Sequence, residues 1–279
     1  MANEIEKGAL YVVATPIGNL SDITERARYV LSNVDFVAAE DTRVSGKLLS
    51  VLGIKNTFVS YHEHNKNTAG NIVLEKLMSG LSGAIVTDAG VPAISDPGED
   101  VVRLCRESGV KVIPIPGACA FVTALSASGM SSRRFVFEGF LPTDKKERAQ
   151  VLEVVKNDRR TTIFYEAPHR LVKTLEIMKE ALGNRKICLA RELTKLNEEF
   201  SYFTFDQALD VFREKEPRGE YVIIVEGCCD TEKECFWQNM TVEQHVEFYT
   251  DKGLKKMDAI KSCAKDRGVA KNEIYKYFV

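Results

Sequence analysis

Short apolar segments rich in β-branched residues alternate with segments of helical periodicity from the start of the chain to about residue 117. This alternation predicts strands joined by helices, which build a mostly parallel sheet covered on both faces. We expect a first domain over residues 1–117. Its expected strands are residues 10–14, 36–39, 58–61, 84–87 and 111–115, and its helices are 23–31, 43–52, 70–78 and 100–107. Asp22 is expected to cap the first helix, with Glu25 completing a capping box.

A second domain is expected over residues 118–228, opening with a helix-like segment between Gly117 and Gly129. Its expected strands are 135–139, 162–165, 187–191, 199–205 and 221–225, with helices near 146–155, 171–181 and 207–213. Only a few residues join the third and fourth of these strands, so they are expected to pair antiparallel. The sequence thus predicts a two-domain α/β fold with mixed sheets. The segment CCDTEKEC reads as a linker, and residues 236–279 as a small C-terminal helical domain.

The composition, 44% apolar and 28% charged, is that of a soluble globular protein, and no apolar run approaches the roughly 20 residues of a membrane span. The first ten residues have no signal-peptide core, so we expect a cytoplasmic protein. The seven cysteines are scattered, without a C-x-x-C pair or a neighbouring histidine. Free thiols are therefore expected rather than disulfides or a zinc site, and no metal is predicted.

The turn DAGVPAISDPG, residues 88–98, directly follows the apolar segment AIVT. Ligands in open α/β sheets lie outside the carboxyl ends of the strands, so this long loop is a candidate binding site. Asp96 is expected to cap the next helix, with Pro97 at its first position and Glu99 completing a capping box. The alternative is an ordinary, well-capped turn between strand and helix.

Polar residues also follow other strands of the first domain. TPIGNLSD lacks the G-x-G-x-x-G spacing, because Gly18 stands alone, so Glu40 is not expected to bind the ribose of a nicotinamide cofactor. Asp41, Arg43, His62 and His64 follow the second and third strands and are expected to meet at one rim. No third ligand accompanies the two histidines, so contact with a substrate is favoured over metal binding.

The second domain carries dense charge at two strand ends, FYEAPHR and ARELTK. Two interpretations are open, a functional site and a structural ion-pair network. The ionisable residues concerned are Glu166, His169, Arg170, Arg191, Glu192 and Lys195.

The C-terminal segment is basic although the net charge of the chain is only −2. Residues 252–276 contain eight Lys or Arg against three acids, and 257–278 read as a helix, a turn at Gly268 and a second helix that begins near Lys271 or Asn272. This is helix-turn-helix spacing, which would suit phosphate contacts. A small helical cap on the second domain is the alternative.

Nine motifs follow one another over about residues 8–228: TPIGNL, AEDTR, SYHEHN, DAGVPAISDPG, PIPGA, EGFLP, FYEAPHR, ARELTK and GEYVIIVEG. In this order they resemble the signature set of the tetrapyrrole methylase superfamily, most closely its ribosomal RNA small subunit methyltransferase I branch. The resemblance implies the class III methyltransferase fold and a homodimer that binds S-adenosylmethionine between its two α/β domains. It also implies methylation of the ribose 2′-hydroxyl of a cytidine, C1402, in the decoding region of 16S ribosomal RNA within the small subunit.

The resemblance further implies which loops hold the cofactor. They contain Pro16, Ile17, Gly18, Asp88, Ala89, Gly90, Val91, Ile94, Ser95, Gly117, Ala118, Cys119, Ala120 and Pro168. For catalysis we expect Glu166 or Glu192, with Arg191 and Lys195, to organise the hydroxyl and its flanking phosphates. Expected contacts with RNA are Asp41, Arg43, His62, His64, His169, Arg170, Lys255, Lys261 and Lys271.

Two other functions remain open from the sequence. A methyltransferase of the same fold could act on another substrate, such as a porphyrinoid or a protein side chain. A non-catalytic RNA-binding or ribosome-assembly module would use the same basic tail without a cofactor. Binding of S-adenosylmethionine separates an enzyme from such a module.

Overall fold

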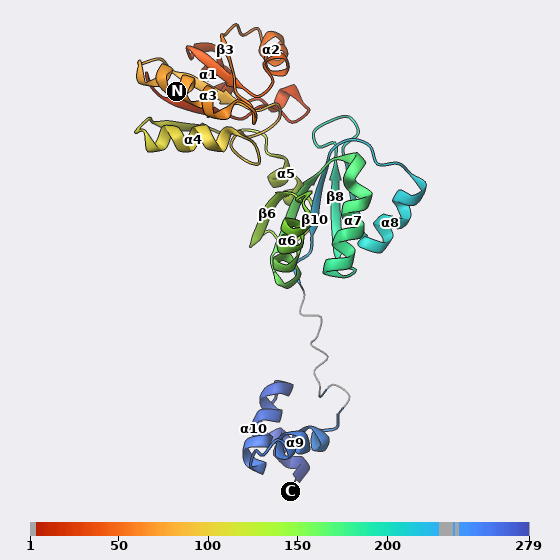
Figure 1. Cartoon of the computed structure of the whole chain (residues 1–279). Coiled ribbons are helices and arrows are strands. Elements are labelled where there is room, and N and C mark those ends of the chain that lie inside the picture. Colours follow the sequence, from red (N-terminus) through yellow and green to blue (C-terminus); the bar gives the residue numbers. More distant parts are fainter. Residues whose placement is uncertain (1–3, 229–236, 238–239, 279) are drawn as a thin grey trace. The chain divides into compact units, whose positions relative to one another are not determined.

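The computed structural model describes residues 4–228, 237 and 240–278. Its contacts divide the chain into two compact units, Met1–Gly227 and Cys228–Val279. The first unit contains two separate five-stranded sheets, drawn in red to yellow and in green to blue in Figure 1. The expected linker CCDTEKEC lies, apart from Cys228, outside the described residues.

The first sheet is wholly parallel, in the order β3-β2-β4-β1-β5. Its strands are β1 Leu10–Val13, β2 Phe36–Ala39, β3 Phe58–Ser60, β4 Gly83–Val86 and β5 Val112–Ile115. Its helices are α1 Glu25–Asn33, α2 Thr42–Val51, α3 Lys66–Met78 and α4 Gly98–Glu107, with a 3-10 turn at Leu20–Asp22. Helices α1 and α2 share one buried cluster with the sheet, and α3 and α4 share another. Both faces are therefore covered, as the alternation of elements predicts.

The second sheet is mixed, in the order β6-β7-β10-β8-β9. Only β6 and β7 are parallel, and the expected antiparallel pair β8 and β9 is confirmed. The strands are β6 Phe135–Phe140, β7 Thr161–Glu166, β8 Lys186–Arg191, β9 Glu199–Thr204 and β10 Tyr221–Val225. Helix α5 Ala120–Ala127 packs on one face. The other face is covered by α6 Lys145–Asn157, α7 Pro168–Leu182 and α8 Phe205–Glu214.

One expected helix cap is wrong and a second is only partly right. Asp22 lies inside the 3-10 turn, and Thr24 caps α1 by accepting a hydrogen bond from the Ala27 nitrogen at 3.0 Å. Helix α4 begins at Gly98, one residue later than expected, and has no capping box. The Asp96 carboxylate does hold its start, because it accepts from the Gly98 nitrogen at 2.7 Å.

The second unit contains α9 Val242–Asp251, α10 Lys256–Arg267, α11 Lys271–Tyr275 and a 3-10 turn at Lys276–Phe278. The expected helix, turn and second helix are present, and the turn is possible because Gly268 adopts the left-handed conformation, with φ of 65°. The second helix starts after Ala270 and has no side-chain cap. The helices share a core that includes Val246, Ile260 and Ile274.

No helix in the described part of the chain is long and apolar enough to cross a membrane. The cysteines at 105, 119, 188 and 263 are free thiols, whereas Cys229 and Cys235 lie outside the described residues.

Candidate active site

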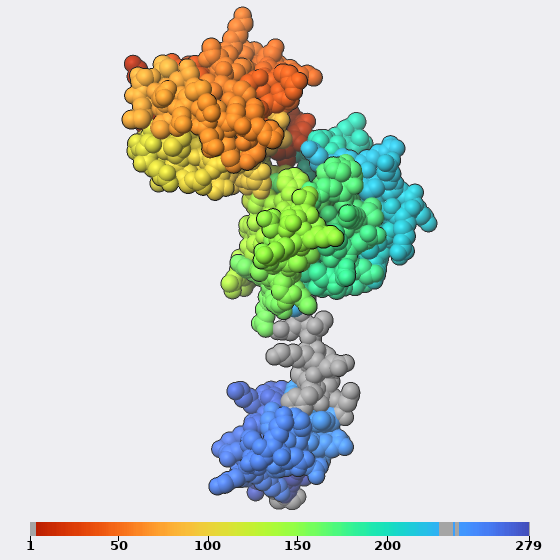
Figure 2. Space-filling model, viewed as in Figure 1, coloured from red at the N-terminus to blue at the C-terminus, as the bar shows by residue number. Residues whose placement is uncertain are grey.

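A cleft of about 350 Å³ lies between the carboxyl ends of the first sheet and one face of the second. The two surfaces that border it meet where yellow joins green in Figure 2. The first domain contributes Ile17, Glu40, Thr87, Ala89, Gly90, Val91, Ile94, Ser95, Asp96 and Pro97. The second contributes Cys119, Ala120, Phe140, Tyr165, Glu166, Ala167, Ala190, Leu193, Glu220, Tyr221 and Val222.

The loop 88–98 forms much of the first wall, and its backbone is strained. Ala93 and Ser95 have positive φ angles of 66° and 61°, which residues other than glycine rarely adopt. The Asp96 carboxylate holds the loop in this shape, since it accepts from the nitrogens of both Ala93, at 3.0 Å, and Gly98. Backbone strain of this kind clusters at ligand-binding sites, which favours a binding loop over an ordinary turn.

Thr15 and Gly90 join this loop to the loop after β1. Their backbones exchange two hydrogen bonds, of 2.9 and 3.2 Å. Gly90 has a φ of 89°, and a Cβ built there would lie 3.3 Å from Ile17 Cγ2. The two loops therefore form a narrow, largely apolar slot in which the backbone itself is the wall.

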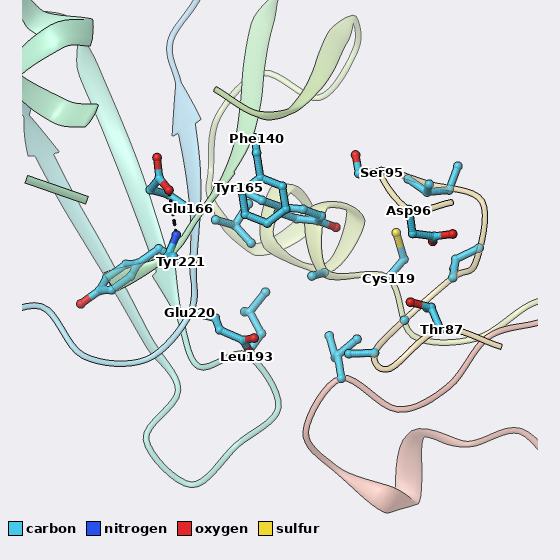
Figure 3. A pocket seen from close by; sticks show the side chains of 18 of the residues that line it. Thr87, Ser95, Asp96, Cys119, Phe140, Tyr165, Glu166, Leu193, Glu220 and Tyr221 are labelled. Atoms are coloured by element: carbon cyan, nitrogen blue, oxygen red, sulfur yellow. Dashed lines mark hydrogen bonds between the residues drawn. The ribbon is translucent and has the colours of Figure 1, made fainter. Parts of the chain in front are cut away.

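Aromatic rings of Phe140 and Tyr165 form the opposite wall, as Figure 3 shows, whereas the ring of Tyr221 points away from them into the core beneath α7 and α8. Phe140 and Tyr165 meet edge to face with their ring centroids 5.7 Å apart. The Tyr165 hydroxyl accepts a hydrogen bond from the Phe121 nitrogen at 3.2 Å, and burial raises the pKa of this phenol to about 12. The ring is thus neutral and fixed at neutral pH.

Glu40 brings a partly buried carboxylate into the cleft. The register pairs Ala39 of β2 with Val86 of β4, so Glu40 follows beside Thr87. The Thr87 hydroxyl donates to the Glu40 carboxylate at 3.2 Å. Burial, followed by the charge of Asp88, raises the pKa of Glu40 above its usual value.

Glu166, an expected catalytic residue, also borders the cleft, but its carboxylate is engaged within the second domain. It accepts from the Ala167 nitrogen at 2.9 Å and from the Thr174 hydroxyl at 2.6 Å, and it pairs with Arg170 at 3.3 Å. Figure 3 shows its bond to the backbone. These contacts fix the start of α7.

The other expected catalytic residues, Arg191, Glu192 and Lys195, do not border the cleft and form ion pairs. Arg191 pairs with Glu199 at 2.9 Å, and Lys195 pairs with Glu192 at 2.9 Å and with Glu220 at 3.0 Å. The bond from Lys195 holds the pKa of Glu192 below its usual value. The structure thus favours the ion-pair network that the sequence left open.

The expected contacts of the first domain lie outside the cleft. Asp41 caps α2 and pairs with Arg43 at 2.7 Å, and the hydrogen bonds from Arg43 lower the pKa of Asp41 to about 2. The rings of His62 and His64 lie 6.0 Å apart, centroid to centroid. No group of three potential metal-binding side chains occurs among the described residues.

The remaining expected contacts lie elsewhere. His169 is exposed in the first turn of α7, and Arg170 donates to the Leu141 carbonyl at 2.7 Å. Lys255, Lys261 and Lys271 belong to the second unit, where Lys261 pairs with Asp258 at 3.0 Å.

The structure brings together only part of the expected cofactor set. Those that border the cleft are Ile17, Ala89, Gly90, Val91, Ile94, Ser95, Cys119 and Ala120. Those that do not are Pro16, Gly18, Asp88, Gly117, Ala118 and Pro168. Gly18 instead lies under Lys195, and a Cβ built there would be 2.5 Å from Lys195 Cγ.

Several residues that the second domain contributes were not expected from the sequence, namely Phe140, Tyr165, Leu193, Tyr221 and Val222. The alternation of side chains along β7 does indicate one of these residues. Phe164 belongs to the core beneath α7, so the next residue, Tyr165, must face the side of the sheet that carries α5.

The sequence profile described as "Tetrapyrrole (Corrin/Porphyrin) Methylases" matches residues 9–210. A protein of Halalkalibacterium halodurans named ribosomal RNA small subunit methyltransferase I is 49% identical over 98% of this chain and 95% of its own length. Its Bacillus subtilis namesake is 48% identical over 97% and 94%. In fold, the chain resembles a Thermus thermophilus uroporphyrin-III C-methyltransferase solved with S-adenosyl homocysteine, with a TM-score of 0.55 and 16% identity over 78% of this chain and 97% of that one. The chain therefore belongs to the tetrapyrrole methylase family and, within it, to the ribosomal RNA small subunit methyltransferases I.

Proposed function

We propose that this protein transfers the methyl group of S-adenosylmethionine to the ribose 2′-hydroxyl of a cytidine in 16S ribosomal RNA. The observation that carries the proposal is the 48–49% identity to proteins named as small-subunit methyltransferases over nearly the whole chain. Five solved methylases with this fold are 15–18% identical to the chain and support the fold alone, so a tetrapyrrole substrate does not follow from them.

The cleft suits this cofactor. Its volume of about 350 Å³ falls within the range of roughly 300–1,000 Å³ that small-molecule sites occupy. The slot beside Gly90 and the aromatic wall suit an adenosine, and the acids Glu40, Asp96 and Glu220 suit a positively charged sulfonium. When bound, the cofactor would supply an electrophilic methyl group, and the protein would align the hydroxyl with it.

We also propose that the basic second unit binds RNA phosphates through Lys255 and Lys271. Lys255 is exposed at the start of α10, and Lys271 opens α11. Removing a cation that neutralises a phosphate of single-stranded RNA lowers the slope of log affinity against log salt by about 0.7. In the K255Q/K271Q protein we expect the slope to be lower by about 1.4, twice the value for one cation. Lys55→Gln, which replaces an exposed lysine of the first unit, is the control and should keep the full slope. An unchanged slope in the double variant would remove these lysines from the interface.

A homodimer that acts in the cytoplasm on the small subunit completes the proposal, supported by the family resemblance. Light scattering on the purified protein tests the dimer.

The decisive experiment incubates the protein with radiolabelled S-adenosylmethionine and small subunits that lack the modification, then maps the labelled nucleotide. Label on a cytidine ribose supports the proposal. Cofactor binding without transfer to RNA favours another substrate, and absence of cofactor binding by calorimetry favours a non-catalytic RNA-binding module.

A further inference from the structure

Four acidic residues border the cleft, Glu40, Asp96, Glu166 and Glu220. A hydroxyl that attacks a methyl group must lose its proton, and a positioned carboxylate can accept it. The four carboxylates differ in the hydrogen bonds and ion pairs that they already form within the protein. This difference separates their roles.

Three of the four are poorly placed to accept a proton. Asp96 holds its own loop through two backbone nitrogens, and Glu166 holds the start of α7 through a backbone nitrogen, a hydroxyl and a guanidinium. The side chain of Glu220 is 80% exposed and pairs with the Lys195 ammonium. The carboxylates of Asp96 and Glu166 thus already accept hydrogen bonds from groups of their own domain, and that of Glu220 extends into solvent.

Glu40 differs from all three. In the part of the chain that the structure describes, its carboxylate accepts one side-chain hydrogen bond, from Thr87. The charged or titratable groups that interact with it are Asp88 and Asp96 in the loop after β4 and His62 after β3. Both carboxylates disfavour its charged form, as does its burial, while His62 acts in the opposite direction. Glu40 is thus a cleft carboxylate with spare accepting capacity, held in position by one hydroxyl.

We propose that Glu40 is the catalytic residue that accepts the proton of the ribose 2′-hydroxyl, an assignment that rests on the proposed function. The 2′-oxygen forms a bond to the methyl carbon while the bond from that carbon to sulfur breaks. The electron pair of the broken bond stays on sulfur, which becomes a neutral thioether. The proton passes from the 2′-oxygen to a Glu40 carboxylate oxygen and then to solvent, so the positive charge lost by sulfur leaves as the proton.

Single-turnover methylation at saturating cofactor tests the assignment. Glu40→Gln keeps the size of the side chain and can still accept from Thr87, but it cannot take a proton. We expect its rate to fall by about 10²- to 10⁴-fold. The wild-type rate should decline as the pH falls through the raised pKa of Glu40, and the variant should lack this decline. Glu75→Gln, an exposed acid on α3, is the matched control and should behave as wild type.

A second variant separates the role of the base from a loss of folding. Glu40→Asp retains the carboxylate but withdraws it by one methylene, so we expect an intermediate rate and a preserved decline at low pH. A Glu40→Gln rate within threefold of wild type, or an Asp variant no faster than the Gln variant, would overturn the assignment while the proposed function stood. Ribosomal RNA left unlabelled by the wild-type protein would overturn both.

Calorimetry gives a readout without turnover. The cationic sulfonium of S-adenosylmethionine favours an ionised Glu40, so at a pH where Glu40 is partly protonated its binding should release more protons than binding of neutral S-adenosylhomocysteine. Titrations in buffers of different ionisation enthalpy measure this difference, which Glu40→Gln should abolish and Glu75→Gln should keep. An unchanged difference, or a Glu40→Gln protein that no longer binds S-adenosylhomocysteine, would contradict a role as base.

Discussion

The loop 88–98 of the first domain and the segment 191–195 of the second both follow a buried strand, and the second carries the greater charge. Loop 88–98 borders the cleft largely through backbone and small side chains. In the segment 191–195, Arg191, Glu192 and Lys195 are satisfied by ion pairs, and only Leu193 borders the cleft. Both segments contain two non-glycine residues with positive φ, Ala93 and Ser95 in the first and Glu192 and Thr194 in the second, so backbone strain does not distinguish them. They differ in that the charges of the second form ion pairs within the second domain, whereas the first borders the candidate site.

The difference has a physical origin. A cluster containing both signs of charge neutralises itself, and each pair lowers the tendency of its members to act on a ligand. The loop 88–98, whose Asp96 accepts from its own backbone, instead leaves a mainly apolar surface open to a ligand. Charges that act on a substrate are therefore better sought where opposite charges are scarce, as around Glu40.

The largest expected effect tests the backbone wall. Gly90→Val places a branched side chain into the slot beside Ile17, and we expect the dissociation constant for S-adenosylmethionine to rise by about 10²-fold or more. The positive φ of Gly90 adds strain of roughly 1–3 kcal/mol. Isothermal calorimetry measures the affinity and thermal unfolding measures the stability.

Gly80→Val is the matched control for this prediction. Gly80 has a φ of 91°, almost that of Gly90, but a Cβ built there would meet nothing within 4 Å. The control should lose comparable stability and keep its cofactor affinity. Equal affinities in the two variants would show that the slot beside Gly90 does not hold the cofactor.

The fold could be predicted from the sequence because its signals are local. The expected strand at 84–87 and its partner at 36–39 match β4 and β2 within one residue, since buried parallel strands read as continuous apolar runs. The caps were less predictable. Asp22 and Thr24 are both acceptable capping residues, and the 3-10 turn that decides between them depends on tertiary contacts.

Only part of the candidate site could be predicted from the sequence, because local signals mark its loops but not its strands. The loop containing Gly90 and Ser95 shows itself by its turn residues. The wall containing Tyr165 is built of ordinary strand residues. Their alternation indicates which face of the sheet Tyr165 lies on, but not that the loops of the first domain border that face. The pairing of Lys195 with Glu220 likewise joins residues 25 apart in sequence, which spacing alone could not indicate.

A smaller effect on methylation is expected from substitution of Glu166, because its contacts within the second domain indicate a structural role. Glu166→Gln removes the charge that pairs with Arg170. The amide oxygen of glutamine is also a weaker acceptor than the carboxylate for the Ala167 nitrogen and the Thr174 hydroxyl. We expect the free energy of unfolding to fall by about 1–3 kcal/mol, with single-turnover methylation by the folded protein within threefold of wild type. Denaturant titration and rate measurements at 15 °C check this, and a rate loss of 10²-fold in a stable protein would return Glu166 to the active site.

The smallest effect is expected from Lys195. Lys195→Met retains an apolar stem over Gly18 but removes the ammonium that pairs with Glu192 and Glu220. Because these groups are partly or largely exposed, the loss of stability should stay within about 1 kcal/mol, and the methylation rate should remain within threefold of wild type. Lys179→Met, which breaks the exposed pair with Asp206 on the far side of the second sheet, is the control and should give a similar small change. A rate loss confined to Lys195→Met would mean that this cation reaches the substrate, and the ion-pair network would then be part of the active site.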